Sequence, residues 1–380
     1  MTSFNKLTYV PPPKPDVSQF PLLDVDTLPQ TVFWRVLGTA VSLRRDYKSK
    51  TEAAFTAWLA NRLPVTLIDA AGNVHVDLRT LPTHRTMFTS HTDTVHAGGG
   101  KNNVRVDGNV WRADTGAALG ADDAAGIAIM CHMIDAGVQG YYVFFRGEER
   151  GGVGSTWLAE NMPTLFVDID RAIAFDRGGF YDVITHQMHG RCCSDKFAQA
   201  LCNELSTEAS WYMPSSSGVY TDTAEFIELV PECTNISVGY ENQHGDQERQ
   251  DVDFLWRLAQ KCLAVEWDAL PTVRDPKVVE RWDAWNNDDM WYTSYQTVED
   301  DKEEELWGAL DAATDSRRSQ HRLRELIAEA MYPSDPSIGL GLMTGTRLSA
   351  EQLDDAIEML SNGWESQQVL ETLFELAVYP

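Results

Sequence analysis

The segment LGADDAAG, residues 119–126, places two adjacent carboxylates directly before a run of small residues. Small and apolar residues continue to residue 136, which predicts a helix able to pack closely against a neighbouring sheet. An Asp pair at the start of a helix often only caps its first N–H groups. The segment therefore has to be judged together with the other polar segments of the chain.

Four other short polar segments follow apolar runs: SHTD (90–93), GEE (147–149), FDR (175–177) and QHG (243–245). We predict that each of them, like residues 120–123, lies directly after a strand. Because strands alternate with helices along this part of the chain, we expect a three-layer α/β/α fold with a mostly parallel mixed sheet. Ligands bind beyond the carboxyl ends of such strands, so the five segments are expected to meet there.

The periodicity of apolar residues locates the individual elements. Helical spacing covers residues 28–63, with a break near 46–49, and recurs at 124–136, 155–160, 195–205 and 252–266. Strands are predicted at 65–68, 73–77, 86–90, 104–106, 109–112, 141–145, 171–175 and 234–238.

The composition excludes several classes of protein. With 57 Asp and Glu against 31 Lys and Arg, the formal net charge is −26, which would repel a phosphate backbone. No apolar run is long enough to span a membrane, and the first 20 residues lack the apolar core of a signal peptide. The six cysteines form no zinc-finger or disulfide pattern. We therefore expect a cytoplasmic protein that binds neither nucleic acid nor membrane.

Three regions of the chain differ in composition. Residues 1–20 are proline-rich and predict an extended lead-in, whereas residues 21–270 carry all five polar segments. Residues 271–380 hold 23 acidic and 9 basic residues and are predicted to form an acidic helical extension. That extension either packs on the preceding domain or mediates oligomer or protein contacts, and its tryptophan-rich part could also cover the active site.

The five polar segments supply two imidazoles and several carboxylates, a donor set that suits zinc. Two divalent ions about 3.5–4 Å apart need one carboxylate between them. One His and one further carboxylate for each ion, plus one bridging Asp, make five ligands, and the segments offer that set. Each segment alone has an ordinary structural explanation, but together, in order at predicted strand ends, they favour a two-metal site.

The segments resemble motifs of the co-catalytic zinc exopeptidases, a group that includes aminopeptidases, peptidase T and carboxypeptidases or deacylases. LGADDAAG (119–126) is similar to the segment that carries the bridging Asp of the group. EERGGVGS (148–155) is similar to the segment that carries its general base and one metal ligand. The resemblance spans about residues 30–265 and does not extend to the acidic tail.

The resemblance implies a role for each matching residue. Asp122 would bridge the two ions, and Glu148 would act as general base toward a metal-bridging water and then protonate the leaving amine. Asp93 would hydrogen-bond the second ring nitrogen of one ligand histidine, a contact that fixes its tautomer. The remaining metal ligands would be His91, Glu149, Asp176 and His244. The cofactors implied are two divalent ions, with zinc preferred over cobalt or manganese.

Several assignments leave two alternatives open. Asp122 is chosen as the bridge because it lies four residues before Gly126, as in the family, and Asp123 is the alternative. The peptide bond between these two Asp residues is expected to be cis. Asp222 would shape the substrate pocket, unless it merely begins a turn before a helix. Tyr240 could donate a hydrogen bond to the oxyanion, or it could be a packed side chain only.

The spacing between the last two ligands bears on the subfamily. Only 68 residues separate Asp176 from His244, too few for the lid domain that the carboxypeptidase, deacylase and peptidase T branches insert there. We therefore expect a lidless, aminopeptidase-like form, although residues 120–123 and 175–179 are also similar to peptidase T. These two signals leave open whether the site binds a free amine or a free carboxylate of its substrate.

The sequence thus predicts a hydrolase, specifically a di-zinc metallopeptidase that cleaves a terminal bond in a peptide or small amide. One alternative is an amidase or deacylase that acts on a non-peptide amide. Another is a non-catalytic binding or scaffold protein that keeps the fold, and the presence of Glu148 argues against it.

Overall fold

The computed structural model describes residues 20–278, except 115, 188–189 and 208–209, together with Leu373. The predicted lead-in before residue 20 and the predicted helices of the acidic extension lie outside the described residues. Leu373 is helical and buried.

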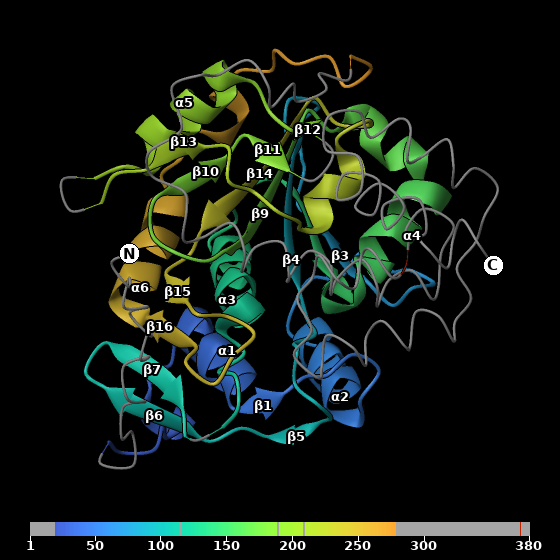
Figure 1. The fold of residues 1–380 in the computed structure, drawn as a ribbon. Helices are drawn as coiled ribbons and strands as arrows, with labels where there is room; N and C mark the ends of the chain where they lie inside the picture. The colour runs from blue at the N-terminus through green and yellow to red at the C-terminus, as the bar shows by residue number, and fades with distance from the viewer. Residues whose placement is uncertain (1–19, 115, 188–189, 208–209, 279–372, 374–380) are drawn as a thin grey trace, which may run out of the picture.

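An eight-stranded mixed sheet forms the centre of the molecule (Figure 1), with the strand order β13-β10-β14-β9-β4-β8-β3-β2. Its strands are β2 (Leu67–Ile68), β3 (Val74–Asp77), β4 (Thr86–His91), β8 (Tyr141–Phe145), β9 (Arg171–Arg177), β10 (Asp182–Ile184), β13 (Met213–Ser215) and β14 (Glu232–Ser237). The four neighbouring strands β14, β9, β4 and β8 run parallel. Their carboxyl ends therefore lie at one edge of the sheet.

Both faces of this sheet are covered, as the alternation of side chains along its strands requires. In β8, Tyr142 and Phe144 face one core, whereas Tyr141, Val143 and Phe145 face the other. The first core also contains buried residues of the helices α1 (Val32–Val41), α2 (Lys50–Ala60), α3 (Ala121–Asp135), α5 (Asp195–Leu205) and α6 (Val252–Cys262). The second core contains residues of α4 (Val153–Asn161) and of the 3₁₀-helices η4 (Pro163–Asp168) and η5 (Asp222–Phe226). The predicted three-layer α/β/α fold is confirmed.

Smaller sheets flank the central one. An antiparallel sheet of order β15-β16-β7-β6 brings the chain after β14 against an earlier hairpin. Its strands are β6 (Val104–Asp107), β7 (Val110–Ala113), β15 (Tyr240–Glu241) and β16 (Arg249–Asp251). Two further pairs are β1 (Leu43–Arg44) with β5 (Gly100–Lys101), and β11 (His186–Gln187) with β12 (Gly190–Arg191).

One expectation from the sequence needs correction. Residues 120–123 do not directly follow a strand but begin helix α3, in which Asp122 and Asp123 have non-helical backbone angles. Regular helix therefore begins at Ala124, the start that the sequence predicts. A separate contact attaches residues 271–276 to the central sheet. There Val273 and Arg274 donate backbone N–H groups to the buried Glu232 carboxylate, at 2.6 and 3.1 Å, which fixes the segment to the sheet.

Within the described residues, no helix has the length and apolar character needed to cross a membrane. Between Asp176 and His244 the chain contributes β10, β13 and β14 to the central sheet.

Helix α3 approaches the sheet closely because it carries glycine at residue 126. A Cβ at Gly126 would lie 2.5 Å from the carbonyl oxygen of Phe175 and 2.6 Å from the carboxylate of Asp123. Since backbone atoms of β9 cannot easily retreat, we expect Gly126→Ala to lower the free energy of unfolding by about 1–3 kcal/mol, as overpacking does. Chemical denaturation would measure this change. Gly245→Ala is the control, because its nearest Cβ contact would be 3.8 Å, and equal stability of the two variants would contradict the argument.

Candidate metal centre

The candidate ligands come together at the carboxyl edge of the parallel strands. His91 is the last residue of β4, Asp176 lies near the end of β9, and Glu149 is in the 3₁₀-helix η3 (Glu148–Arg150), shortly after β8. Asp122 stands at the first turn of α3, and His244 lies in the loop between β15 and β16. Five segments that are far apart in the sequence therefore supply one cluster.

Asp122 is shared between two groups of side chains. Its Oδ1 lies 2.9 Å from Nε2 of His91, which is in turn 3.5 Å from an oxygen of Asp176. Its Oδ2 lies 3.2 Å from Nε2 of His244, which is also 3.2 Å from an oxygen of Glu149. In each group of three, the candidate ligand atoms lie within 4.8 Å of one another. The two groups share only Asp122.

Glu148 lies beside both groups. One of its carboxylate oxygens is 3.9 Å from Nε2 of His91, and it forms a third possible ligand group with His91 and Glu149. Burial, together with the nearby carboxylates of Asp176 and Glu149, raises the pKa of Glu148 well above its ordinary value, although His91 opposes this shift.

Asp93 holds the turn that carries Glu148 and Glu149. Its Oδ1 accepts the N–H groups of Gly147 at 2.8 Å and Glu148 at 3.2 Å, and its Oδ2 accepts that of Glu149 at 3.3 Å. The expected hydrogen bond between the Asp93 carboxylate and His91 is replaced by one to the Asp93 backbone. Nδ1 of His91 lies 3.2 Å from the backbone carbonyl oxygen of Asp93 and 3.7 Å from its carboxylate, too far for a hydrogen bond to the latter.

Asp123, the neighbour of Asp122, has a structural role. The Asp122–Asp123 peptide bond is cis, as the resemblance led us to expect. The carboxylate of Asp123 accepts the backbone N–H groups of Gly126 at 2.8 Å and of His91 at 3.2 Å. Asp123 therefore caps the first turn of regular helix and attaches it to the end of β4, whereas Asp122 faces the two histidines.

Three side chains surround Asp176. The hydroxyl of Tyr240 donates a hydrogen bond to its Oδ1 at 3.0 Å, and the hydroxyl of Thr221 donates to its Oδ2 at 2.7 Å. Asn235 pairs with the backbone of Asp176 at 2.9 and 2.7 Å. Tyr240 is buried and thus orients a candidate ligand in this structure, and donation to an oxyanion stays a prediction. The sequence pattern gave no indication of the contacts made by Thr221 and Asn235.

Asp222 begins η5 and is 2% exposed. Burial raises its pKa well above the ordinary value, because hydrogen bonding to Ser155 and the charge of His91 offset only part of the effect. Its Oδ1 is buried without a hydrogen-bond partner among the described residues. Asp222 is therefore buried close enough to His91 for their charges to interact, and that it shapes the substrate pocket stays a prediction.

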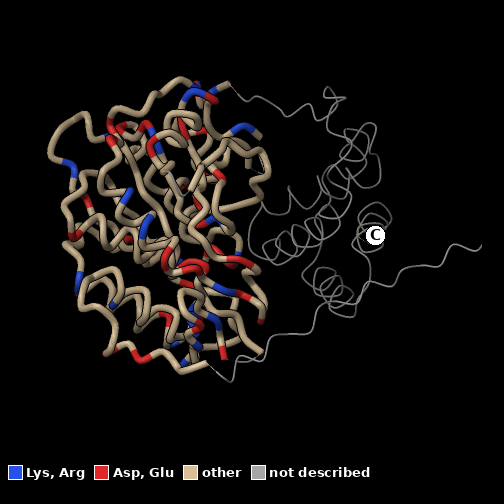
Figure 2. Tube along the Cα trace, turned by 90° about the vertical axis from the view of Figure 1, so that its left-hand side faces the viewer, with Lys and Arg blue, Asp and Glu red and all other residues tan. Residues whose placement is uncertain are grey.

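The cluster holds far more acid than base. Figure 2 shows many acidic positions close together near the middle of the described trace. Burial lowers the pKa of His91, but hydrogen bonds to Asp122 and Asp176 outweigh it and hold that pKa well above its ordinary value. Burial raises the pKa of Asp122, but the hydrogen bonds of His244 and His91 reverse the effect and lower it strongly. The site therefore favours positive charge between its carboxylates.

Two buried charged residues next to Asp122 were not predicted from the sequence. Arg45 is fully buried on the chain after β1, and Glu248 is 2% exposed in the loop before β16. Burial and the charge of Asp122 raise the pKa of Glu248 to about 7, and two backbone hydrogen bonds oppose that rise. Glu248 lies four residues after His244, but no recognisable spacing marks either residue.

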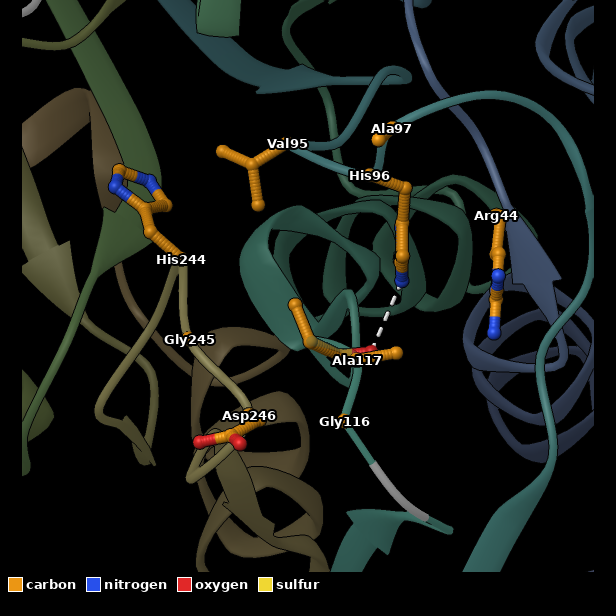
Figure 3. Close-up of a pocket in the computed structure, with 10 residues that line it drawn as sticks. Arg44, Val95, His96, Ala97, Gly116, Ala117, His244, Gly245 and Asp246 are labelled. Atoms are coloured by element: carbon orange, nitrogen blue, oxygen red, sulfur yellow. Dashed lines mark hydrogen bonds between the residues drawn. The ribbon is translucent and has the colours of Figure 1, made fainter. Parts of the chain in front are cut away.

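A cavity of about 250 Å³ adjoins His244 (Figure 3). It is lined by residues 95–97, 116–118 and 244–246 and by Arg44. Figure 3 shows His244 on one side of this cavity, Arg44 on the other and the ring of His96 between them. The ring nitrogens of His96 are paired with Oγ1 of Thr94 at 2.7 Å and with the carbonyl oxygen of Ala118 at 2.9 Å.

His96 makes stability depend on pH. Burial lowers its pKa from 6.5 to about 4, so its neutral form contributes stability above pH 6.5 that is lost as the pH falls toward 4. The loss amounts to at most about 3 kcal/mol. We expect His96→Gln to remove this part of the pH dependence, measured as the free energy of unfolding at several pH values. If the free energies of unfolding of parent and variant changed with pH in the same way, His96 would not be the group responsible.

Comparisons with known proteins concern the fold. No protein-family model matches the sequence, and no curated protein matches it. Among solved structures, the aminopeptidase PepT of Bacillus cereus has a TM-score of 0.51 at 15% identity, over 62% of this chain and 97% of that chain. A tripeptidase of Staphylococcus aureus has a TM-score of 0.50 at 15% identity, over 62% of this chain and 96% of that chain.

The match covers nearly the whole of both solved structures and leaves over a third of this chain unmatched. At this identity the likeness concerns the course of the backbone. The resemblance read from the five polar segments is thereby confirmed at the level of the fold, and this chain has the α/β fold of these two peptidases.

Proposed function

We propose that the protein is a metal-dependent peptidase that hydrolyses a terminal peptide bond with two divalent ions, zinc being the first candidate. The proposal rests on one observation, that the two carboxylate oxygens of Asp122 contact two different sets of side chains. One carboxylate whose two oxygens face two different histidines, each beside a further carboxylate, has the form of a bridging ligand. The fold shared with known peptidases supports the reaction class.

The donor set fits such ions on physical grounds. Imidazole nitrogen and carboxylate oxygen are ordinary zinc ligands. Oε1 of Glu149 is buried without a hydrogen-bond partner among the described residues, although its other oxygen lies 3.2 Å from His244. Burying several carboxylates without compensating charge is costly, and divalent cations would remove that cost. His91 and Asp176 would hold one ion, His244 and Glu149 the other, and Asp122 both.

The chemistry then follows from the chain's own residues. Bound divalent ions would supply Lewis acidity toward the scissile carbonyl and make water more acidic. Glu148 accepts a proton from the attacking water and returns it to the leaving amine, a role that suits its position beside both groups of candidate ligands. Asp93 keeps Glu148 in place through the N–H groups of its turn. Tyr240 and Thr221 fix the two oxygens of Asp176.

The cavity beside His244 is the proposed place for the substrate. Its volume of about 250 Å³ is below the range of pockets that enclose drug-sized ligands, so it suits the end of a peptide. We further propose that no separate lid domain is inserted between Asp176 and His244. A lidless site of this kind favours an aminopeptidase-like form. One alternative is an amidase or deacylase, which a substrate panel separates from a peptidase. The other is a non-catalytic binding or scaffold protein that keeps the fold, which would bind metal but cleave no amide.

The proposal is tested by metal analysis together with hydrolysis assays. We expect the purified protein to bind two equivalents of zinc and to cleave dipeptides, tripeptides or aminoacyl amides. Removal of the ions should abolish turnover, and zinc should restore it. Requirement for a free α-amine would identify an aminopeptidase, whereas preference for acylated amines would identify a deacylase. A protein that binds no divalent ion and cleaves no amide would refute the proposal.

Glu148 gives the sharpest single test. We expect Glu148→Gln to keep both ions but to lower kcat by about 10²–10⁴-fold, because proton transfer is lost while the ligands stay. Metal content and steady-state kinetics would be measured on the same preparation. Glu160→Gln, an exposed residue of α4, is the control for loss of one acidic charge. Unchanged kcat in Glu148→Gln would exclude Glu148 as the general base.

A further inference from the structure

The peptide unit of Gly120 is held from both sides by buried charges of opposite sign. Its N–H donates to Oε2 of Glu248 at 2.8 Å, and its carbonyl oxygen accepts from Nη2 of Arg45 at 2.8 Å. Oε1 of Glu248 also accepts the backbone N–H of Asp122 at 3.0 Å. Both oxygens of one carboxylate are therefore used on the turn that ends in the candidate bridging ligand.

Arg45 connects this turn to the segment after His91. Its Nη1 donates to the carbonyl oxygen of Thr92 at 2.8 Å, and its backbone N–H donates to Oγ1 of Thr94 at 3.0 Å. The guanidinium thus spans two backbone carbonyl groups, one from each segment. A guanidinium can do this because its donors are fixed in a planar fork.

Glu248 connects the same turn to the loop of His244. The backbone N–H of Glu248 donates to the carbonyl oxygen of Gly245 at 3.1 Å, so Glu248 and His244 belong to one tight loop. Arg45 and Glu248 together join the segments that supply His91, Asp122 and His244. Neither side chain belongs to the candidate ligand groups.

Burying a charged side chain costs free energy unless hydrogen bonds compensate for the lost contacts with water. Arg45 is fully buried and Glu248 is 2% exposed, and a buried charge that loses its partners is strongly destabilising. The guanidinium of Arg45 donates to the carbonyl groups of Thr92 and Gly120, although its Nε has no hydrogen-bond partner among the described residues. The carboxylate of Glu248 accepts the N–H groups of Gly120 and Asp122. The positions of the Arg45 and Glu248 side chains therefore depend on the Gly120–Asp122 backbone, and the position of that backbone depends equally on these two side chains.

We propose that Arg45 and Glu248 are positioning residues that fix the Gly120–Asp122 backbone and so set the affinity of the centre for its divalent ions. This inference rests on the proposed function, since it concerns the same centre. Asp122 lies 2.9 Å from His91 and 3.2 Å from His244, so a displaced turn alters both groups at once. Partners of metal ligands typically contribute 10–100-fold in affinity.

The decisive variant is Glu248→Gln. Glutamine keeps the size of the side chain, but its NH₂ group would face one of the two N–H donors, leaving that donor without an acceptor. We expect the affinity of metal-free protein for zinc, measured by competition with a chelator, to fall about 10–100-fold for both ions. The visible spectrum of the cobalt-loaded variant should change as well, because the ligand geometry changes.

The matched control is Glu232→Gln. Glu232 is also fully buried, and it accepts backbone N–H groups of Ser194, Val273 and Arg274 away from the centre. Both variants lose comparable hydrogen bonds, so both should be less stable. The control should keep the parent's zinc affinity and cobalt spectrum, which separates positioning from general destabilisation.

A second variant, Arg45→Lys, keeps the charge but cannot span Thr92 and Gly120 with a planar fork, and it should weaken zinc binding in the same direction. Folding would be checked by circular dichroism, and whichever of the two variants folds decides the question. Parent-like zinc affinity and cobalt spectrum in a folded variant would overturn the inference while leaving the proposed function intact. A parent that binds zinc but cleaves no amide would overturn the proposed function alone. A parent that binds no divalent ion would overturn both.

Discussion

The position of Asp122 between His91 and His244 is the constraint on which the rest of the site depends. The two histidines are 153 residues apart in the sequence, and each approaches a different oxygen of the same carboxylate. The parallel strands bring His91, Asp176 and the turn of Glu149 to one edge. The first turn of α3 then has to deliver Asp122 into the middle of this edge, and close packing at Gly126 allows the helix to come near enough.

Much of the fold follows from the local pattern of residues. The predicted strands near residues 86–90, 141–145, 171–175 and 234–238 are the four parallel strands at the centre of the sheet. Their apolar runs are long enough to show that both faces are buried. The predicted helix start at Ala124 also matches the first regular turn of α3. The three-residue strands β10 and β13 escaped prediction because so short a segment carries no periodicity.

The candidate site, like the fold, could be predicted only in part from the sequence. The five candidate ligands and Glu148 stand in motifs that can be read from the sequence, and the structure brings all of them together. Arg45 and Glu248 could not be found, because the groups that their side chains bind are backbone groups 47 to 128 residues away. The contacts of Asp93 were misjudged for a related reason. A backbone carbonyl competes with its carboxylate for Nδ1 of His91, and sequence spacing cannot decide between them.

The candidate ligands differ in their access to solvent. The side chains of His91 and Asp176 are 1% and 7% exposed, whereas that of His244 is 38% exposed and lies beside the cavity. Ions on the two sides of Asp122 would then exchange with solvent at different rates. In the proposed centre, an ion beside His244 would leave through the cavity, whereas one beside His91 would leave only after the protein opened locally. The two halves of a symmetric ligand set would thus be kinetically unequal.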